Sequence, residues 1–421
     1  MMFPRKLTNA EEQVLREQAI TDDKPGTVLH DFGALLDAIG PGGVEASGKY
    51  HMLPIKLIGE LDGLLSRPLK LEMKRPQIRS HPYLQGLNVL LRASGICCVE
   101  GTGATARLVV DPVMKMQWDQ LNLTERYFNL LEAAFRFGRA EMVGEDSRAS
   151  SELLWPCLVD WQHTPHDGKT FNSERTDHIY LMGVGRNWFQ LALMDLFGLM
   201  KVEQPPVPIT KWYPAGLRHT PFGDAVMNLL FSDRYKFHDT ESEDEEDEYE
   251  NDDEDEDALP QQQFGVWQSL FQPFFPEWER NLEIPTIEPR DGMFIFRVSL
   301  GKVWRLIAMP SEATLANLAS TILDSVNFDH DHLYEFNYRD RLGSKRSVHS
   351  SEMDEGPFAY DVKIGHLPLE PKETMTFVFD FGDCWEFKVK LERIEPRGKQ
   401  KSARILERHG KAPEQYPSWD E

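Results

Sequence analysis

One stretch of the chain carries so many negative charges that it cannot join a folded core. Between Asp239 and Asp257, 15 of 19 residues are Asp or Glu and none is Lys or Arg. Such dense like charges repel one another, and they leave too little apolar surface to offset the entropy lost on ordering. We therefore expect residues 236–263 to form an acidic disordered linker that divides the chain. A docking site for a basic protein partner, or an internal mimic of nucleic acid, is the other interpretation of this run.

The remainder of the chain has the composition of a folded protein. Its 421 residues are 41% hydrophobic and 11% aromatic, which excludes a disordered or fibrous polymer, and their number suggests two or three domains. Removing the 15 acidic residues of the run from the net charge of -23 leaves -8, so the rest is only mildly acidic. We expect a mainly helical region at 1–235, an aromatic and Pro-rich strap at 264–290 and an α+β domain at 291–421.

Cysteine usage and apolar patterning bear on compartment and cofactors. The most apolar stretch, His178–Met200, is interrupted by Arg186 and Asp195, and Met1–Leu7 lacks the apolar core of a signal peptide. We expect a cytoplasmic protein with no membrane span, no cofactor and no metal. The four cysteines form no Cys-x-x-Cys pair and have no His at zinc-ligand spacing, which argues against a disulfide scaffold and a structural zinc: Cys97, Cys98, Cys157 and Cys384.

The N-terminal region contains a helix, a hairpin and a second helix in succession. Leucines recur at helical spacing after Pro82, and Gly95 can take the positive φ that ends such a helix. The β-prone runs Ile96–Val99 and Ala106–Val110 follow, and Asp111-Pro112 then has the form of an N-cap with proline at N1. This order of elements is typical of a winged helix. A capping box then opens a further helix, at Asn122 and Glu125.

A similar order returns further along the chain. An apolar stripe over Trp188–Leu196 predicts a helix that stops at Gly198. Leu199–Glu203 and Lys211–Tyr213 are expected as wing strands, and Thr220-Pro221 predicts the start of another helix. We therefore expect two winged-helix modules in tandem.

The first of these modules is locally basic. Residues 66–140 contain 11 Lys and Arg against six acidic residues, a net of +5 within an acidic chain. Such a reversal is the footprint of a phosphate-facing surface, so double-stranded DNA is one expected partner. The alternative is that the modules serve only for protein packing. The residues expected to face phosphates are Lys74, Arg75, Arg79 and Arg107.

After the acidic run, aromatic residues and prolines dominate a short segment. We expect it to pack as a strap on one of the two domains, and an exposed partner-binding segment is the alternative. Its aromatic residues are Phe264, Trp267, Phe271, Phe274, Phe275 and Trp278.

The C-terminal region alternates apolar and polar residues with the period of a strand. Strands are predicted over Met293–Leu300 and Trp304–Met309, a helix over Thr314–Val326 and a third strand over Leu333–Tyr338. A loop is expected over Arg339–Lys372.

A hairpin is expected to close this domain, with strands over Thr374–Phe381 and Cys384–Ile394. Glycine at the first position of the two-residue Gly382-Asp383 turn favours type II′, with positive φ at Gly382. The result is an α+β domain with a mainly antiparallel sheet.

At these residues the chain resembles the plasmid pRiA4b ORF-3-like family, over roughly Gly292 to Pro417. The most specific match is the run Phe379–Glu386, which contains Asp380, Gly382, Asp383 and Trp385. The resemblance implies a compact α+β domain associated with bacterial plasmids and mobile elements. The weaker matches come in the family's order and include Trp304, Arg305, His332 and Phe336. Two departures remove ligand-capable groups: Phe387 replaces a frequent His, and His409–Pro417 replaces a motif with Cys and Pro.

The C-terminal domain also holds the candidate site residues. Imidazoles and carboxylates could together hold a divalent metal or act as acid and base, but the same residues also suit a tight turn and strand packing. We expect a non-enzymatic binding protein that is DNA-associated and linked to plasmids or mobile elements. The alternative is a metal-dependent hydrolytic enzyme that uses His332, Asp380 and Asp383, with His330 nearby.

Overall fold

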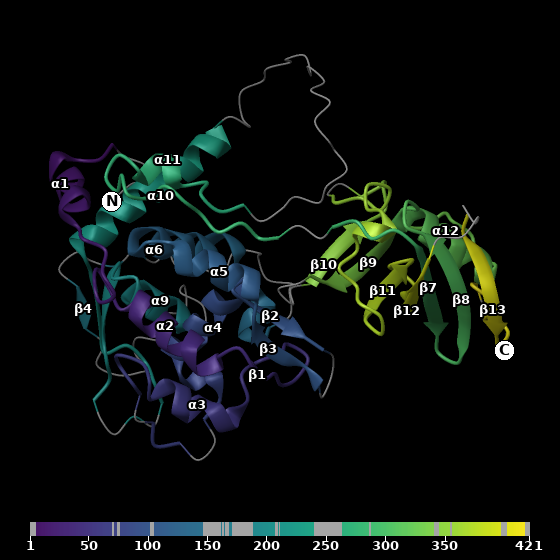
Figure 1. Ribbon diagram of the computed structural model, residues 1–421, viewed down its shortest axis with the longest axis horizontal. Coiled ribbons are helices and arrows are strands. Elements are labelled where there is room, and N and C mark those ends of the chain that lie inside the picture. Colours follow the sequence, from purple (N-terminus) through teal and green to yellow (C-terminus); the bar gives the residue numbers. More distant parts are fainter. Residues whose placement is uncertain are drawn as a thin grey trace. The chain divides into compact units, whose positions relative to one another are not determined.

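The chain, in a computed structural model, folds into two compact units (Figure 1). The N-terminal unit includes Gln262–Ile284, and the C-terminal unit includes Pro285–Glu421. Of the predicted acidic linker, residues 240–262 lie outside the described residues, and residues 236–239 end a helix. The structure describes residues 6–69, 71–73, 76–101, 105–145, 161, 164, 168–170, 188–206, 209, 211–239, 263–285, 288–340, 345–353, 356–396 and 402–416.

The N-terminal unit is mainly helical with two small sheets. Its elements are α1 (Asn9–Glu17), α2 (Val28–Ile39), β1 (Val44–Glu45), α3 (Ile55–Asp62), η1 (Ile78–Ser80), α4 (Pro82–Ala93), β2 (Cys97–Glu100), β3 (Arg107–Val110), α5 (Pro112–Gln120), α6 (Leu123–Glu132), η3 (Ala133–Phe137), η4 (Ala140–Val143), β4 (Lys169–Thr170), α9 (Phe189–Leu196), β5 (Met200–Glu203), β6 (Gly216–His219), α10 (Pro221–Asp239) and α11 (Gln268–Phe271).

The helix, hairpin and helix of the first module form where the sequence predicts them. Gly95 ends α4 with φ of +73°, and β2 and β3 pair as an antiparallel hairpin. The Asp111 carboxylate then accepts the backbone N–H groups of Val113 and Met114 at 2.9 Å, which caps α5. Strand β1 adds to β3, so the sheet order is β1-β3-β2.

The second module repeats this order, with one correction. The partner of β5 is β6 at Gly216–His219, so the expected strand at Lys211–Tyr213 is wrong. The apolar character of that run has another origin, because the Trp212 indole is buried against Tyr83 and donates its N–H to Gln204. Strand β4 adds to β6, and the order β4-β6-β5 matches the β1-β3-β2 order of the first module.

Helices α4 and α9 join the two modules by burying each other. Every residue of both helices is buried. The helices approach closely at Gly86, where a Cβ atom would lie 2.8 Å from the Leu193 Cγ. Beside this contact, the Asp195 carboxylate accepts the Tyr83 hydroxyl at 2.7 Å and pairs with Arg67 at 2.6 Å. Arg67 and Tyr83 favour the charged form of Asp195, but burial has the larger effect and raises its pKa.

One polar face of helix α6 holds the segment that follows the acidic run. Glu125, Asn129 and Glu132 lie on this face at helical spacing. Glu125 accepts the Arg280 backbone N–H at 2.9 Å, and Asn129 accepts that of Leu282 at 2.8 Å.

Glu132 completes this set from the last turn of the helix. Its two carboxylate oxygens accept the N–H groups of Gly265 at 2.6 Å and Trp267 at 2.7 Å. We call residues 263–284, which cover most of the segment predicted at 264–290, the strap. These bonds fix its backbone to the N-terminal unit.

Aromatic packing secures the same segment. The Phe128 ring on α6 stacks on Trp278 with centroids 4.6 Å apart and planes 5° apart. Phe271 and Phe275 also pack on Phe128, and all three strap side chains are fully buried. Because α10 and the strap belong to the same unit, the connection to the C-terminal unit follows Ile284.

The C-terminal unit is an antiparallel sheet with a helix on one face, as the α+β prediction requires. The side chains of α12 share one apolar core with Phe294, Phe336, Phe377 and Val389 from four different strands. The seven strands follow the order β10-β9-β11-β12-β7-β8-β13. Their bounds are β7 (Met293–Leu300), β8 (Val303–Pro310), α12 (Leu315–Val326), β9 (Tyr334–Arg339), β10 (Lys345–His349), η5 (Ile364–His366), β11 (Thr374–Phe379), β12 (Trp385–Glu395) and β13 (Arg404–His409).

The two outermost strands of this sheet were not predicted. Strand β10 lies within Arg339–Lys372, which we expected to be a loop, and β13 pairs with β8 near the end of the chain. Both strands are rich in charged and polar residues. Charged edge strands discourage unwanted pairing with other chains, and they lack the apolar alternation that marks a central strand.

Cutting the backbone inside the acidic run should leave the protein associated under native conditions. A specific protease site inserted after residue 245 would place α10 and the strap on different fragments, and the strap's contacts with α6 should hold those fragments together. We expect the cleaved protein to elute as intact protein in size exclusion and to separate only in denaturant. The same cut in an Asn129→Ala/Glu132→Ala variant should release the fragments. Separation of the cleaved wild type in native buffer would show that the strap's contacts do not hold the two fragments together.

The stability of the N-terminal unit should fall as pH rises through neutrality. Burial raises the pKa of Glu132 from 4.5 to about 7, although the backbone N–H groups of Trp267 and Gly265 oppose the shift. The folded state therefore binds a proton that the unfolded state has lost. This contribution is complete below about pH 4.5 and disappears as pH passes about 7, at a cost of about 3 kcal/mol at most.

Urea unfolding between pH 5 and 8 would measure this effect. We expect Glu132→Gln to remove that part of the slope. Asn129→Ala should lower the free energy of unfolding but keep the wild-type slope, because it removes strap hydrogen bonds without removing a titratable group. An unchanged slope in Glu132→Gln would refute the assignment.

Candidate functional site

The candidate site lies where the start of β9 meets the end of β11. Helix α12 ends at Asn327, which takes the left-handed conformation with φ of +59°, and the buried Phe328 anchors the turn that follows. In the sheet register Tyr334 pairs with Phe379, and the Asp380 N–H donates to the Leu333 carbonyl at 3.0 Å. This pairing brings the loop before β9 beside the loop after β11.

The loop after β11 is longer than the two-residue turn we expected. It spans Asp380–Cys384, and its left-handed residues are Asp380 at φ of +56° and Cys384 at +54°. The prediction of a type II′ turn with positive φ at Gly382 is therefore wrong. The reason is the Asp380 side chain, whose Oδ1 accepts the N–H groups of Gly382 at 2.9 Å and Asp383 at 3.3 Å. This bonding is a backbone-mimicking Asx turn.

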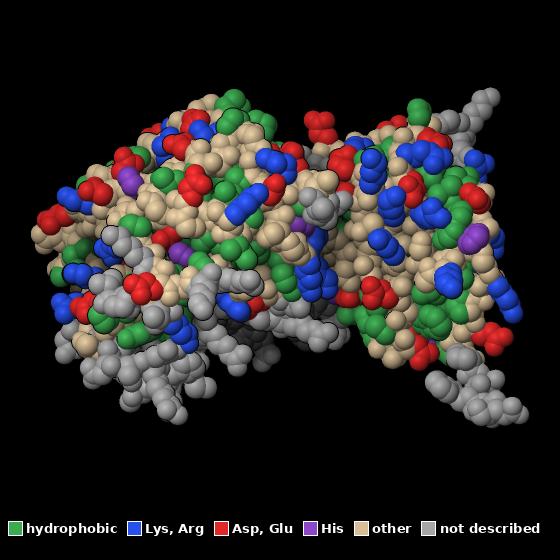
Figure 2. All heavy atoms as spheres, turned by 90° about the horizontal axis from the view of Figure 1, so that it is seen from below, with side chains coloured by type: hydrophobic (Ala, Val, Ile, Leu, Met, Phe, Trp, Pro, Cys, Tyr) green, Lys and Arg blue, Asp and Glu red, His purple; other side chains and the backbone are tan. Residues whose placement is uncertain are grey.

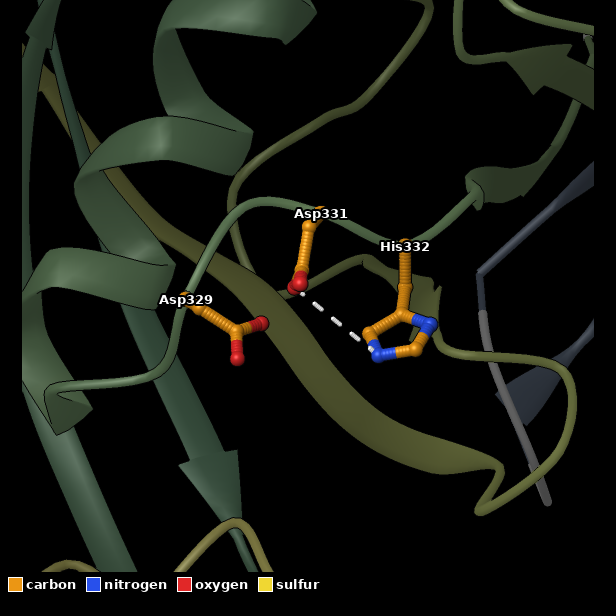
Figure 3. Close-up of side chains that lie close together, drawn as sticks. All are labelled: Asp329, Asp331 and His332. Carbon is orange, nitrogen blue, oxygen red and sulfur yellow. Dashed lines mark ion pairs between the residues drawn. The ribbon is translucent and has the colours of Figure 1, made fainter.

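Three carboxylates and one imidazole converge beside this loop. Ligand atoms of Asp329, Asp331 and His332 all lie within 4.8 Å of one another, and Figure 3 shows the Asp331 carboxylate between the other two side chains. The His332 Nε2 lies 3.8 Å from Asp331 Oδ1 and 3.6 Å from Asp380 Oδ2. We call Asp329, Asp331, His332 and Asp380 the acidic cluster.

The last described residues of the chain close one side of the acidic cluster. The Tyr416 hydroxyl lies 2.9 Å from His332 Nε2 and donates to Asp329 at 2.8 Å. The Gln415 amide donates to the other Asp329 oxygen at 2.6 Å and accepts the Asp329 N–H at 2.7 Å. The segment after β13 therefore fixes Asp329 in place.

The crowded carboxylates shift one another's proton affinity. The Asp331 carboxyl donates a hydrogen bond to Asp329, which raises the pKa of Asp331 and lowers the pKa of Asp329 to about 2. The Tyr416 hydroxyl donates to Asp329 as well, so the pKa of Tyr416 rises to about 12.

The predicted site residues separate into two groups. His332 and Asp380 meet in the acidic cluster, whereas His330 pairs with Asp324 at 3.0 Å. Asp383 lies exposed in the Asp380–Cys384 loop, where the interaction described for it is the bond from its backbone N–H. Sequence reasoning missed Asp329, Asp331, Gln415 and Tyr416. The alternation of Asp and His at 329–332 was a readable signal for the first two.

The remaining motif residues contribute to the structure of the domain. Arg305 is buried and donates to the carbonyls of Ser325 at 3.0 Å and His409 at 2.8 Å, which ties β8 to α12 and β13. Phe336 is a core residue. Trp385 is half-buried against Phe328, and Trp304 stacks on His409 on the sheet.

The basic residues of 66–140 are used largely within the N-terminal unit. Arg107 is exposed, but its guanidinium donates to the carbonyls of Gly42 at 2.8 Å and Gly43 at 2.9 Å. Arg79 is exposed on η1, and Lys74 and Arg75 lie outside the described residues. Further donors to backbone or carboxylate oxygens of this unit are Arg67, Arg92, Lys115, Arg126, Arg136 and Arg139.

The surface view agrees with this distribution of charge. Among the described side chains on the face drawn in Figure 2, Lys and Arg lie over the C-terminal unit as well as the N-terminal one. That face shows no separate basic stripe on the described part of the N-terminal unit.

The acidic cluster has the ligand types of a divalent metal site. Bonds of about 2.0–2.1 Å to nitrogen and oxygen in a tetrahedral zinc site place neighbouring ligand atoms about 3.3–3.4 Å apart. The separations of 3.6 and 3.8 Å around His332 Nε2 are only slightly wider. Asp329, Asp331 and His332 are the described residues whose ligand atoms lie close enough together to hold such an ion.

The fold and site define the C-terminal unit as an α+β domain whose antiparallel sheet ends beside an Asp–His cluster. Residues 295–416 match the model of the plasmid pRiA4b ORF-3-like protein family, which confirms the resemblance for this domain. No helix in the described part of the chain is long and apolar enough to cross a membrane.

Two relatives share only a part of the chain. An uncharacterized protein, y4hQ, from Sinorhizobium fredii is 29% identical over 115 residues, which cover 26% of this chain. The chain spans 57% of the length of that relative. A crystal structure of a protein of unknown function, MM3350, from Methanosarcina mazei Go1 is 25% identical and covers 29% of this chain and 72% of that one, with a TM-score of 0.27.

Replacing Cys384 with glycine should stabilise the C-terminal domain. Cys384 is exposed and has φ of +54°, which glycine adopts without steric cost. We expect Cys384→Gly to raise the free energy of unfolding by about 0.5–1 kcal/mol in urea titrations. The matched control is Asp383→Gly at the neighbouring exposed position, where φ is not positive and the more flexible unfolded chain should make the variant less stable. Equal effects of the two substitutions would argue against strain at Cys384.

Proposed function

We propose that this is a non-enzymatic binding protein whose C-terminal domain holds a positively charged group of its partner at the acidic cluster. The observation that carries the proposal is the convergence of three carboxylates on one imidazole at the surface. Among the described residues, the ion pairs of these carboxylates involve histidine alone. Charge-assisted hydrogen bonds to the carboxylates would hold a cation placed there.

The N-terminal unit supports a scaffolding role in this proposal. In helix-turn-helix proteins a recognition helix enters the major groove of DNA. Here α4, the helix before the hairpin, is buried along its whole length against α9 and its surroundings, so its side chains are not available to base edges. Duplex DNA could still meet the exposed Arg79, and we retain this as the weaker route to a partner.

The cellular setting is part of the same proposal. The family's description names a plasmid reading frame, and this supports an association with plasmids or mobile elements. The described cysteines Cys97 and Cys384 are free thiols, as suits a reducing cytoplasm. The acidic run remains a proposed docking site for a basic protein.

A metal-dependent hydrolytic enzyme is the second candidate. The convergence of ligand atoms from Asp329, Asp331 and His332 favours it, because a bound ion could activate water there. In that case Asp329, Asp331 and His332 would act as ligands. Asp383 would have no part, since its carboxylate lies outside the cluster.

Binding of a small cation would separate the two candidates. Selective histidine labelling would allow the His332 imidazole signals to be followed by NMR while L-arginine amide is titrated into the full chain. We expect saturable shifts at millimolar concentration that weaken about fivefold or more in Asp331→Asn and Asp380→Asn, because each removes a charged acceptor.

Asp383→Asn and His330→Ala are the matched controls and should respond like the wild type. Elemental analysis of the purified protein completes the test. Stoichiometric zinc or manganese that disappears in His332→Ala, together with no response to arginine amide, would overturn the proposal in favour of the enzyme.

A further inference from the structure

Exposed apolar side chains belong to residues next to the acidic cluster in the chain or bonded to it. Leu333 directly follows His332 and is 38% exposed, Phe381 directly follows Asp380 and is 45% exposed, and Tyr416 is 56% exposed. They come from the same three segments that build the cluster. In the described part of the C-terminal unit, Tyr360 is the only other large apolar side chain of comparable exposure. We call Leu333, Phe381 and Tyr416 the apolar rim.

Hydrogen bonds within the folded domain explain where each rim residue lies. They do not explain why its side chain is exposed. Leu333 is fixed by the bond from the Asp380 N–H to its carbonyl, and Phe381 follows Asp380 into the Asx turn. Tyr416 is fixed through its hydroxyl, which leaves its ring open to solvent. Exposed apolar groups held rigidly beside charged groups are typical of protein interaction sites.

The charge of the site selects the occupant. The carboxylates of Asp329, Asp331 and Asp380 would repel a phosphate backbone. A planar guanidinium can bond two carboxylate oxygens at once, and its apolar neighbours in a peptide can cover aromatic rings. A bare metal ion would satisfy the carboxylates but would leave the rim exposed.

We infer that the acidic cluster and the apolar rim together bind a segment of a partner protein in which arginine or lysine stands next to an aromatic or aliphatic residue. The basic group lies among Asp331, Asp380 and His332, and the apolar neighbour packs on Phe381 and Tyr416. This inference rests on the proposed function, because it names the partner of the same site. It adds the rim, which the binding of a cation alone does not need.

Selection from a random peptide library on the full-length protein tests the inference. We expect enriched peptides to share a basic residue within two positions of an aromatic or aliphatic one. Their affinity should fall about tenfold in Phe381→Ser and in Asp380→Asn. Tyr360→Ser removes an equally exposed aromatic ring elsewhere in the domain and should leave the affinity unchanged, so it controls for general stickiness.

The variants also separate a wrong role for the rim from a wrong role for the cation site. Enriched peptides that lose affinity in Asp380→Asn but not in Phe381→Ser would overturn the role of the rim while the cation site of the proposed function stands. Peptides that bind both variants like the wild type, or selected sequences without basic residues, would overturn both. Melting curves of each variant would show that its fold is intact.

Discussion

The polar face of helix α6 determines how the whole chain is organised. Glu125, Asn129 and Glu132 give their oxygens to backbone N–H groups of the strap, which otherwise would end buried without partners. Two buried carboxylates are unfavourable unless they are fully hydrogen-bonded, and the strap supplies the donors they need. The oxygens of α6 therefore satisfy the strap's N–H groups, and the strap's N–H groups satisfy the carboxylates of α6. Through these bonds, the elements on either side of the acidic run, α10 and the strap, belong to the same unit.

Local signals in the sequence predicted much of this fold. Asp111-Pro112, the capping box at Asn122 and Glu125, and the alternation of Met293–Leu300 each depend on residues close together in the chain, and each predicted element is present. Elements defined by distant partners were missed. Strands β10 and β13 exist because β9 and β8 offer them free edges. Likewise, Glu132 has the appearance of a solvent-facing acid until the strap covers it.

The candidate site shows the same division between local and distant information. His332 and Asp380 were named from motifs, but only the pairing of β9 with β11 makes them neighbours. Tyr416 is 84 residues from His332, and nothing in its local sequence marks it as a member of the site. The prediction of positive φ at Gly382 was wrong for a local reason. The Asp380 side chain accepts the Gly382 N–H, and this bond sets the conformation of the loop instead. Most of the family's aromatic motif residues prove to be packing residues.

The distance between α6 and the strap has a consequence for synthesis of the protein. Contacts between them join residues 133 to 155 positions apart, across the acidic run. Domains generally fold as their residues leave the ribosome, and contacts of large sequence separation form slowly. During translation, the N-terminal unit must therefore remain incomplete, with Phe128 and the buried carboxylates of α6 uncovered, until the strap has emerged. The acidic run reaches the exit tunnel just before the strap, so a strongly charged, solubilising segment is attached to the nascent chain when its unfinished core is most prone to aggregate.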